Sequence, residues 1–418
     1  ESVESARGAG IRVVMITGDY LKTAIAIAHN VKILQAGDNE EVAAVDCARL
    51  RPGQDGEYLS NAEMDIMTSS VRVFARAKPE DKLEIVKSLQ RQGAVTAMTG
   101  DGVNDAPALN QANIGVAMGI QGTEVAKGAS DMILTDDNFC SIVAAVEKGR
   151  VIYAGIQKFV AFIMSVHIAE VLQIFFCVVA GMPIMRTPLQ ILFLILVTDL
   201  PPSIALGMEP GDSTILKEKP RPKNEPVVLG WMWLSMVMNG AVLSLVIIIV
   251  YILSLRMYCD GEVFQSDIQA LDNYGEGLMH ARTVTFISLV WAENVRSYTS
   301  RSFNRPVWHN LLGNVQMQKA IVLAQLCLYA AVLIPYFSDE ILGLDGISIG
   351  GEGWLIALAG PIGTLVLCEL CKIITAFQVS NYQKTLANRH AEESASAEEK
   401  MRKHAAEVEE AGDKTCTI

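Results

Sequence analysis

The nine residues 99–107 bring together side chains that bind metal ions and phosphate. They read Thr-Gly-Asp-Gly-Val-Asn-Asp-Ala-Pro, so two carboxylates, an amide and two glycines share one turn. Because Mg²⁺ prefers oxygen ligands such as carboxylates, we expect Asp101 to bind Mg²⁺. Gly100 and Gly102, on either side, let the backbone turn tightly and approach a ligand. An ordinary loop with a capping aspartate is the alternative interpretation, which a string of this length disfavours.

Further groups suited to phosphate chemistry surround this turn. Lys82 stands at the start of the preceding helical run, where its ammonium group can reach a phosphate as a point charge. Arg76 ends the strand before that run. Asn104 and Asp105 precede a proline, as in the first turn of a helix, and they can fix the loop or hold a water molecule bound to phosphate. We therefore expect catalysis to depend on Asp101, Lys82, Asn104 and Asp105.

Residues 1–150 alternate between strand-like and helical runs, which predicts an α/β fold with a parallel sheet covered by helices. The strand-like runs are Ile11–Ile16, Val71–Ala75, Ala94–Met98, Ile114–Ala117 and Met132–Leu134, and the helical runs are Tyr20–His29, Glu80–Gln92 and Asp105–Ala112. Two acidic turns, Thr17-Gly18-Asp19 and Thr99-Gly100-Asp101, each follow a strand directly. Both turns therefore lie at carboxyl ends of strands, where parallel sheets place their sites.

The rest of the chain is apolar enough to lie in a membrane. Of the 418 residues 51% are hydrophobic, the mean hydropathy is +0.30 and the net charge is −12. These values favour an integral membrane protein and argue against a nucleic-acid partner. Runs near the roughly 20 residues that cross a bilayer predict an all-α bundle of six helices over residues 151–380, at about 151–181, 188–208, 229–255, 282–298, 318–337 and 354–379. The charged tail 381–418 is typical of a solvated helix or disorder.

The charges of the loops predict the orientation of this bundle. Loops 257–281 and 338–353 carry several acids and no Lys or Arg. The loop 209–227 carries the basic residues Lys217, Lys219, Arg221 and Lys223. Since cytoplasmic loops are enriched in Lys and Arg, we expect this loop, the soluble domain and the tail to lie in the cytosol.

Ionisable residues inside the predicted spans are hypotheses for a transport site. His167 and Glu170 share one helical face of the first span, and Asp199 follows Thr198 in the second. Glu293 lies in the fourth span. Their oxygens, together with one imidazole, suit a hard cation. We therefore expect these five residues to bind a transported ion.

Several of these residues have a simpler interpretation. Glu293 can be solvated at the membrane interface beside Arg296. His167 can be a neutral core imidazole bonded to a neighbouring helix, and Thr198 can bond its own helix backbone. We also expect the Pro-Pro pair at 201–202 to break the second span and free backbone carbonyls beside the carboxylate that precedes it.

The string at 99–107 resembles the hinge signature of the P-type ATPases. Met15–Asp19, Phe74–Lys82 and Gly119–Asp137 resemble other segments of that family, in the same order. The resemblance implies that residues 1–150 are the C-terminal part of a phosphorylation domain of haloacid-dehalogenase type, followed by the last six of ten helices of a type II cation pump. In that family the matching positions contact Mg²⁺ at Asp101 and nucleotide or phosphate at Thr17, Gly18, Asp19, Arg76, Lys82 and Asn104.

The resemblance also implies an activity: ATP-driven transport of a cation through a phosphoenzyme cycle, with Mg²⁺ and ATP as cofactors. Ca²⁺ is the cation that the family favours. Ile195 stands one turn before Asp199, where the family often has Asn or Asp, and the lost oxygen makes a site for two Ca²⁺ doubtful because each wants about six to eight oxygens. Transport of one Ca²⁺, or of Na⁺, K⁺ or H⁺, stays open.

The chain departs from the family in one respect. The family phosphorylates an aspartate in Asp-Lys-Thr-Gly-Thr, and no such motif precedes the acidic turns here. Asp413-Lys414-Thr415-Cys416-Thr417 is similar, but it lies beyond the last span, where coincidence is the simpler interpretation. We expect as partners the transported cation, the lipid bilayer and the missing N-terminal half of the pump, without which the chain is inactive. A truncated, catalytically silent membrane protein that regulates a full-length pump is the alternative.

Overall fold

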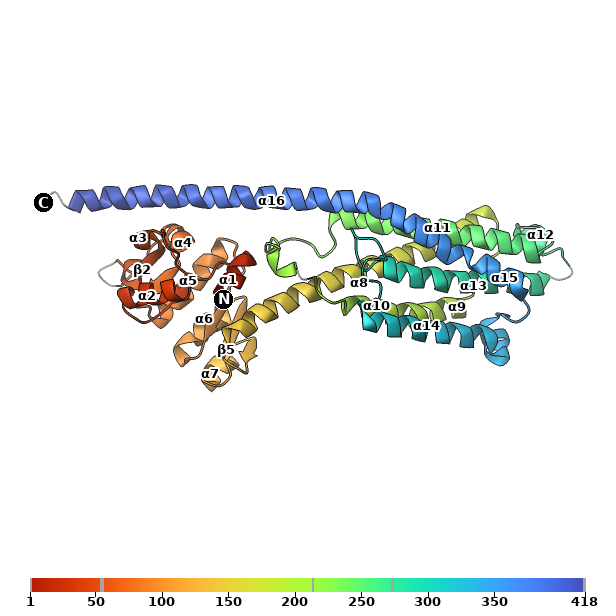
Figure 1. Ribbon diagram of the computed structural model, residues 1–418, viewed down its shortest axis with the longest axis horizontal. Helices are drawn as coiled ribbons and strands as arrows, with labels where there is room; N and C mark the ends of the chain where they lie inside the picture. Colours follow the sequence, from red (N-terminus) through yellow and green to blue (C-terminus); the bar gives the residue numbers. More distant parts are fainter. Residues whose placement is uncertain (1, 53–55, 213, 272–273, 416–418) are drawn as a thin grey trace. The chain divides into compact units, whose positions relative to one another are not determined.

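Parallel strands form the framework of the N-terminal part of the chain (Figure 1). The computed structural model describes residues 2–52, 56–212, 214–271 and 274–415. Within them the strands are β1 (Met15–Ile16), β2 (Ala44–Asp46), β3 (Val73–Ala75), β4 (Ala97–Gly100), β5 (Ile114–Met118) and β6 (Met132–Leu134). One sheet has the order β1-β3-β2 and the other has the order β4-β5-β6. The first acidic turn therefore follows an edge strand, β1, whereas the second begins within an edge strand, β4, whose last two residues are Thr99 and Gly100.

The α/β class is confirmed, but the single parallel sheet that the sequence predicts is divided into two. Every strand pair is parallel, with Ile16 opposite Phe74 in one sheet and Thr99 opposite Val116 in the other. The sequence does not predict β2, because a run of three residues is too short for its alternation to show. Side chains of both faces of β3 are buried, so this strand is the centre of its sheet in packing as well as in order.

Short helices follow the strands of this part. They are α1 (Ser2–Gly8), α2 (Leu21–Asn30), α3 (Glu40–Ala43), η1 (Cys47–Leu50), α4 (Asn61–Ser70), α5 (Pro79–Arg91), η2 (Val103–Asp105), α6 (Ala106–Gln111) and α7 (Glu124–Gly128). α5 begins where the sequence predicts, because Pro79 fits the first turn of a helix and the Asp81 carboxylate accepts a hydrogen bond from the N–H of Lys78 at 2.8 Å. α2 packs on β3, and α6 packs on β4 and β5.

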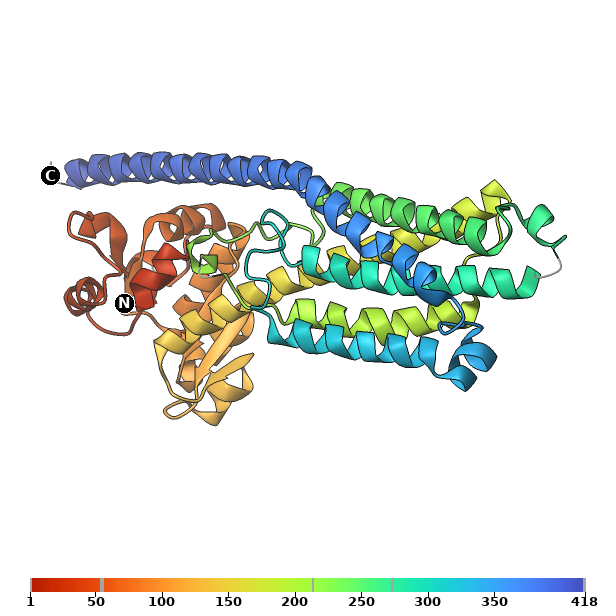
Figure 2. The ribbon, with the colours of Figure 1, turned by 45° about the vertical axis from the view of Figure 1, so that its right-hand side comes forward.

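Longer helices make up a second unit, which comprises residues 150–212 and 226–384. The remaining helices of the chain are α8 (Phe139–Ala180), α9 (Pro188–Phe193), η3 (Leu194–Asp199), α10 (Leu200–Gly207), η4 (Ile215–Lys217), α11 (Gly230–Tyr258), α12 (Gln265–Ile268), α13 (Tyr274–Thr299), α14 (Val315–Leu333), η5 (Tyr336–Leu342), α15 (Gly350–Ala357) and α16 (Ala359–Thr415). In this unit α11 packs along α13, and α10 packs along α14 (Figure 2). Its core is apolar, with Leu243 and Ile247 of α11 and Phe286 and Val290 of α13 fully buried.

Five helical segments among the described residues are long and apolar enough to cross a membrane: Phe139–Ala180, Pro188–Gly207, Gly230–Tyr258, Val315–Leu333 and Gly350–Arg389. They coincide with five of the six predicted spans. The other predicted span, 282–298, lies in α13, most of whose residues are buried. Polar and charged side chains such as Glu293 and Arg296 lower its hydropathy, and both are buried. The count of six spans stays a prediction.

The second predicted span is helical throughout, so the predicted break at the Pro-Pro pair is wrong. α9 and α10 are joined by η3, a π-helical turn over Leu194–Asp199. In an α-helix the prolines at 201 and 202 would each lack the N–H that donates four residues back. The wider π turn accommodates this loss without interrupting the helix, and π turns are frequent at functional sites.

The ends of two long helices differ from the predicted boundaries. α8 begins at Phe139 rather than near residue 151, because the polar turns before the apolar run are also helical. α16 continues through the predicted charged tail to Thr415. Of the motif-like string at the C-terminus, Cys416 and Thr417 lie outside the described residues.

Candidate functional site

Asp105 organises the acidic turn that follows β4. Its buried carboxylate accepts hydrogen bonds from the backbone N–H groups of Asp101, at 3.3 Å, and Gly102, at 3.2 Å, through Oδ2. The other oxygen, Oδ1, pairs with Nζ of Lys82 at 2.5 Å. The structure thus brings together two predicted residues, Asp105 and Lys82, and gives Asp105 the role of fixing the loop.

The two glycines of this turn differ in what they contribute. A Cβ atom on Gly100 would lie 2.5 Å from Cβ of Asp105, so only glycine lets the Asp105 side chain close over the turn. A Cβ atom on Gly102 would meet nothing nearer than 3.7 Å, and its backbone is ordinary, with φ of −96°. Within the protein, only Gly100 is packed so closely that it must be glycine, and the expected approach of both glycines to a ligand stays a prediction.

Asp101 presents a carboxylate that is open to a ligand. Its side chain is exposed and makes no hydrogen bond or ion pair within the described residues, while its main-chain oxygen accepts from the N–H of Thr123 at 2.8 Å. The backbone is therefore held while both carboxylate oxygens are free, which fits a hard cation such as Mg²⁺. Asn104 is also exposed on this turn. Mg²⁺ binding by Asp101 stays a prediction.

A second group of predicted residues gathers at the ends of β1 and β3. Thr17 donates its hydroxyl to Asp19 Oδ2 at 2.9 Å, and the N–H of Asp19 donates back to the Thr17 hydroxyl at 3.2 Å. The N–H of Arg76 donates to the main-chain oxygen of Asp19 at 2.9 Å. Arg76 has φ of +52°, in the left-handed region, which costs a non-glycine residue about 1–2 kcal/mol. Its guanidinium lies 5.6 Å from the ring centre of Tyr20 and is mostly exposed.

The structure thus sorts the predicted phosphate residues into two groups. Thr17, Gly18, Asp19 and Arg76 belong to the β1–β3 sheet end, and the Asp101 turn with Lys82 belongs to the end of β4. No hydrogen bond or ion pair between the two groups occurs in the part of the chain that the structure describes.

The sequence did not single out Asp137, whose side chain holds the loop at residues 119–121 in place. Its carboxylate accepts from the N–H groups of Gly119 at 2.6 Å, Ile120 at 3.1 Å and Gln121 at 2.8 Å. Burial pushes its pKa up, and these three donors outweigh burial and hold the pKa below its usual value. The signal was present, because Asp137 ends the Gly119–Asp137 stretch that resembles the ATPases, but nothing in the sequence joins its side chain to residues 119–121.

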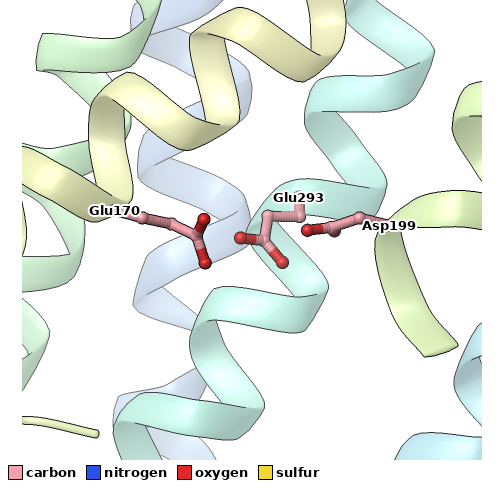
Figure 3. A group of neighbouring side chains, drawn as sticks. All are labelled: Glu170, Asp199 and Glu293. Atoms are coloured by element: carbon pink, nitrogen blue, oxygen red, sulfur yellow. The ribbon is translucent and has the colours of Figure 1, made fainter. Parts of the chain in front are cut away.

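Three acids from separate helices meet inside the helical unit (Figure 3). Glu170 comes from α8, Asp199 from η3 and Glu293 from α13, and their side chains point toward one another in Figure 3. One oxygen of each lies within 4.8 Å of the others, and all three residues are buried. Two ligands of one ion stand at most twice the ion–oxygen distance apart, and Ca²⁺–oxygen distances are about 2.3–2.6 Å. A single hard cation therefore fits among the three carboxylates.

The oxygens of these acids differ in their partners. All four carboxylate oxygens of Asp199 and Glu293 are buried and accept no hydrogen bond from the part of the chain that the structure describes. Glu170 Oε2 lies 3.0 Å from Nδ1 of His167, and Glu170 Oε1 lies 3.3 Å from Nη1 of Arg186. A buried charge needs a hydrogen-bonding partner, a cation or a proton to neutralise it. Of the three acids, Asp199 and Glu293 have no such partner among the described residues.

The simpler interpretations of the membrane residues have different outcomes. Glu293 is only 2% exposed, so a solvated carboxylate at the interface is wrong. Thr198 donates its hydroxyl to the main-chain oxygen of Leu194 at 2.8 Å, which agrees with bonding to its own helix and leaves its lone pairs for a cation. His167 contacts an acid of the cluster rather than a core partner on a neighbouring helix.

Arg186 is the member of this site that sequence reasoning missed. It lies in the connection between α8 and α9, outside both predicted spans, and its side chain is fully buried. The signal was a lone arginine in the apolar linker of residues 181–187, whose sequence is Gly-Met-Pro-Ile-Met-Arg-Thr. Arg186 was missed because the search for ionisable residues was confined to the predicted spans.

Comparison with known families agrees with both halves of the structure. Residues 1–113 match the haloacid dehalogenase-like hydrolases, and residues 182–374 match the family described as "Cation transporting ATPase, C-terminus". A calcium-transporting ATPase 1 of Bacillus cereus is 36% identical over 89% of this chain and 40% of its own length. The P-type sodium-transporting ATPase4 of Toxoplasma gondii is 50% identical over 56% of this chain and 18% of its own length. The protein of the same name in Plasmodium falciparum is 46% identical over 56% of this chain and 19% of its own length.

The chain belongs to the cation-transporting P-type ATPases, and it corresponds to their C-terminal portion, a haloacid-dehalogenase-like domain followed by the C-terminal membrane domain. Its long apolar helices agree with the multi-pass membrane topology of that family. The chain spans at most 40% of the length of the three relatives just described.

Proposed function

We propose that the full-length protein is an ATP-driven cation pump that works through a phosphoenzyme. The observation that carries this proposal is the pair of buried carboxylates, Asp199 and Glu293, whose four oxygens have no donor among the described residues. Such groups are expensive inside a membrane unless a cation or a bound proton neutralises them. They occur in the same chain as an acidic turn with a free carboxylate, which suits Mg²⁺ and a phosphoryl group.

In the proposed phosphoryl transfer, the γ-phosphoryl group of ATP passes to an aspartate carboxylate oxygen and ADP leaves. Mg²⁺, when bound, supplies positive charge that offsets the charge of the phosphate oxygens. Asp101 would hold that ion through its free oxygens. Lys82, which Asp105 fixes at 2.5 Å, would place its ammonium toward the phosphoryl group. Thr17, Asp19 and Arg76 would orient nucleotide or phosphate at the neighbouring strand ends.

For the transported cation we propose Na⁺ first. The relatives with the higher identity, 50% and 46%, are described as sodium-transporting. Ile195 offers no oxygen beside the cluster, and one of the three carboxylates already contacts an arginine. A small oxygen set of low net charge disfavours Ca²⁺, which takes six to eight oxygens. Ca²⁺ is the second candidate, because calcium-transporting relatives match 89% of this chain.

The test is ATP hydrolysis by the purified full-length protein against Na⁺, Ca²⁺, K⁺ and pH, each varied alone. We expect Na⁺ to stimulate turnover and the formation of an acid-stable, hydroxylamine-sensitive phosphoenzyme. Stimulation by micromolar Ca²⁺ in the absence of Na⁺ would replace Na⁺ by Ca²⁺ as the transported ion. No stimulation by any cation would refute the pump.

A further inference from the structure

The linker that carries Arg186 is held firmly inside the helical unit. Residues 181–187 connect α8 to α9, and Met182 and Met185 are buried. The main-chain oxygen of Pro183 accepts from the Tyr251 hydroxyl at 3.0 Å. Thr187 then caps α9 by accepting from the N–H of Gln190. This linker is therefore a positioned segment, and its arginine has a fixed place.

The guanidinium of Arg186 turns inward to the acid cluster. Nη1 donates to Glu170 Oε1 at 3.3 Å, and Nη2 donates to Gln173 Oε1 at 2.7 Å. Its side chain is 0% exposed, and Nε has no acceptor within the described residues. Arginine stays charged in proteins, so a permanent positive charge is buried beside three carboxylates.

The three carboxylates of the cluster differ in how many partners they have. Glu170 has a partner on each oxygen, Arg186 on Oε1 and His167 on Oε2. Asp199 and Glu293 have no partner on any oxygen among the residues that the structure describes. We propose that Arg186 is a resident cation of the membrane site, which neutralises Glu170 so that the transported ion binds between Asp199 and Glu293. This inference rests on the proposed function, because it assigns the ligands of the transported ion.

The proposal gives Glu170 and Arg186 opposite and mutually dependent effects on ion binding. Removing the charge of Glu170 alone leaves an unpaired buried arginine, whose positive charge repels the transported cation. Removing both charges leaves Asp199 and Glu293 as they were. A Glu170 that binds the cation directly predicts the opposite, since its loss cannot be repaired by a second substitution.

The experiment is therefore a double-mutant cycle in the full-length protein with E170Q, R186Q and E170Q/R186Q. The readouts are the cation concentration that half-activates phosphorylation by ATP and the thermal stability of the purified protein. R282Q is the matched control, because Arg282 donates to the Ile184 oxygen of the same linker at 3.0 and 2.8 Å without contacting an acid of the cluster. The double variant is the one most certain to fold, since replacing both members of a buried pair is often neutral.

We expect E170Q to raise the half-activating concentration at least tenfold and E170Q/R186Q to return it to within about threefold of the wild type. R282Q should match the wild type. A folded double variant that remains as weak as E170Q would overturn the proposal and make Glu170 a direct ligand. An E170Q variant with unchanged affinity would also overturn the proposal, because neither Glu170 nor its pairing with Arg186 would then affect ion binding. Failure of the pump proposal is distinguishable, because cation activation would then be absent from the wild type or unaltered by D199N.

Discussion

The buried carboxylate of Asp105 forms an ion pair, 2.5 Å long, with the partly buried ammonium group of Lys82 beside the acidic turn that ends β4. The same carboxylate accepts from two backbone N–H groups of the turn. One side chain thus fixes both the shape of the loop and the direction of the ammonium group. These contacts fix the loop, whereas the Asp101 carboxylate makes no hydrogen bond or ion pair within the described residues, as the proposed binding of Mg²⁺ requires.

D105N should therefore impair both stability and phosphorylation. Breaking a buried pair from one side costs about 3–5 kcal/mol, so we expect the melting temperature of the full-length protein to fall by about 5 °C or more. Phosphoenzyme formation from ATP should fall at least about a hundredfold, because Lys82 loses its support. E84Q is the control, since Glu84 pairs with Lys87 on the outer face of the same helix. A D105N protein that melts with the wild type would contradict this role.

D101N should separate chemistry from stability. The Asp101 carboxylate is exposed and unbonded within the described residues, so the melting temperature should stay within about 1 °C of the wild type. Mg²⁺-dependent phosphoenzyme formation should be lost. N110A, on the exposed side of α6, should phosphorylate normally. Unaltered phosphorylation of D101N at limiting Mg²⁺ would remove Asp101 from the metal site.

D199A should uncouple cation binding from ATP hydrolysis in the proposed pump. Without this buried carboxylate the cation loses one of its two unpartnered ligands, so cation-stimulated ATP hydrolysis should disappear. Phosphorylation by inorganic phosphate, which takes place at the phosphorylation domain rather than at the membrane cluster, should persist. D339N, at an exposed acid of η5, serves as the control for loss of a negative charge. Persistence of cation stimulation in D199A would show that the cluster is not the transport site.

R76G should distinguish backbone strain from side-chain function. Arg76 has φ of +52°, a conformation that glycine adopts without cost, so the melting temperature should not fall. The apparent affinity for ATP should drop about tenfold, because the guanidinium no longer reaches the phosphates. K32G relieves a similar backbone, with φ of +62°, away from the strand ends, and should leave ATP affinity unchanged. Equal ATP affinity in R76G and the wild type would remove Arg76 from the nucleotide site.

Asp137 should make the loop at Gly119–Gln121 sensitive to acid. Its pKa is lowered because three backbone N–H groups outweigh burial. A carboxyl whose pKa falls on folding stabilises above its unfolded pKa, about 3.9, and loses that effect as the pH drops through the lower folded value. Amide exchange of residues 119–121, corrected for the intrinsic rate, should therefore be slow from pH 7 to 5 and accelerate below pH 4. D137N should exchange fast at every pH, whereas D136N should behave as the wild type.

Local signals in the sequence predicted most of the helices and strands. They also pointed to the candidate residues that lie within a single turn or helix. Asp101, Asp105 and Lys82 were found because the turn and helix that hold them are short-range structures. Glu170, Asp199 and Glu293 were each singled out because placing an acid in a membrane is expensive, without any knowledge of the packing. Their membership of one cluster needed the structure.

Long-range relations were missed for physical reasons. Arg186 reaches the cluster from a linker, and only the fold of residues 181–187 shows that its side chain turns inward. The π turn at Leu194–Asp199 replaced the predicted break, because the loss of two N–H donors can be absorbed by a wider helix as well as by its interruption. The division into two sheets depends on which strands pair along their edges. The alternation of strand and helix runs in the sequence does not predict this pairing.

Among the described residues, β1 and β4, the strands that lead into the two acidic turns, each have a hydrogen-bonded neighbour on one side only. The other border of β1 and of β4 therefore presents a row of main-chain groups able to accept an added strand. A purified preparation of this polypeptide would need protection against self-association along those borders. A short extended peptide that pairs with one of these strand edges would block this self-association. Such peptides can be selected for their ability to keep the preparation monodisperse.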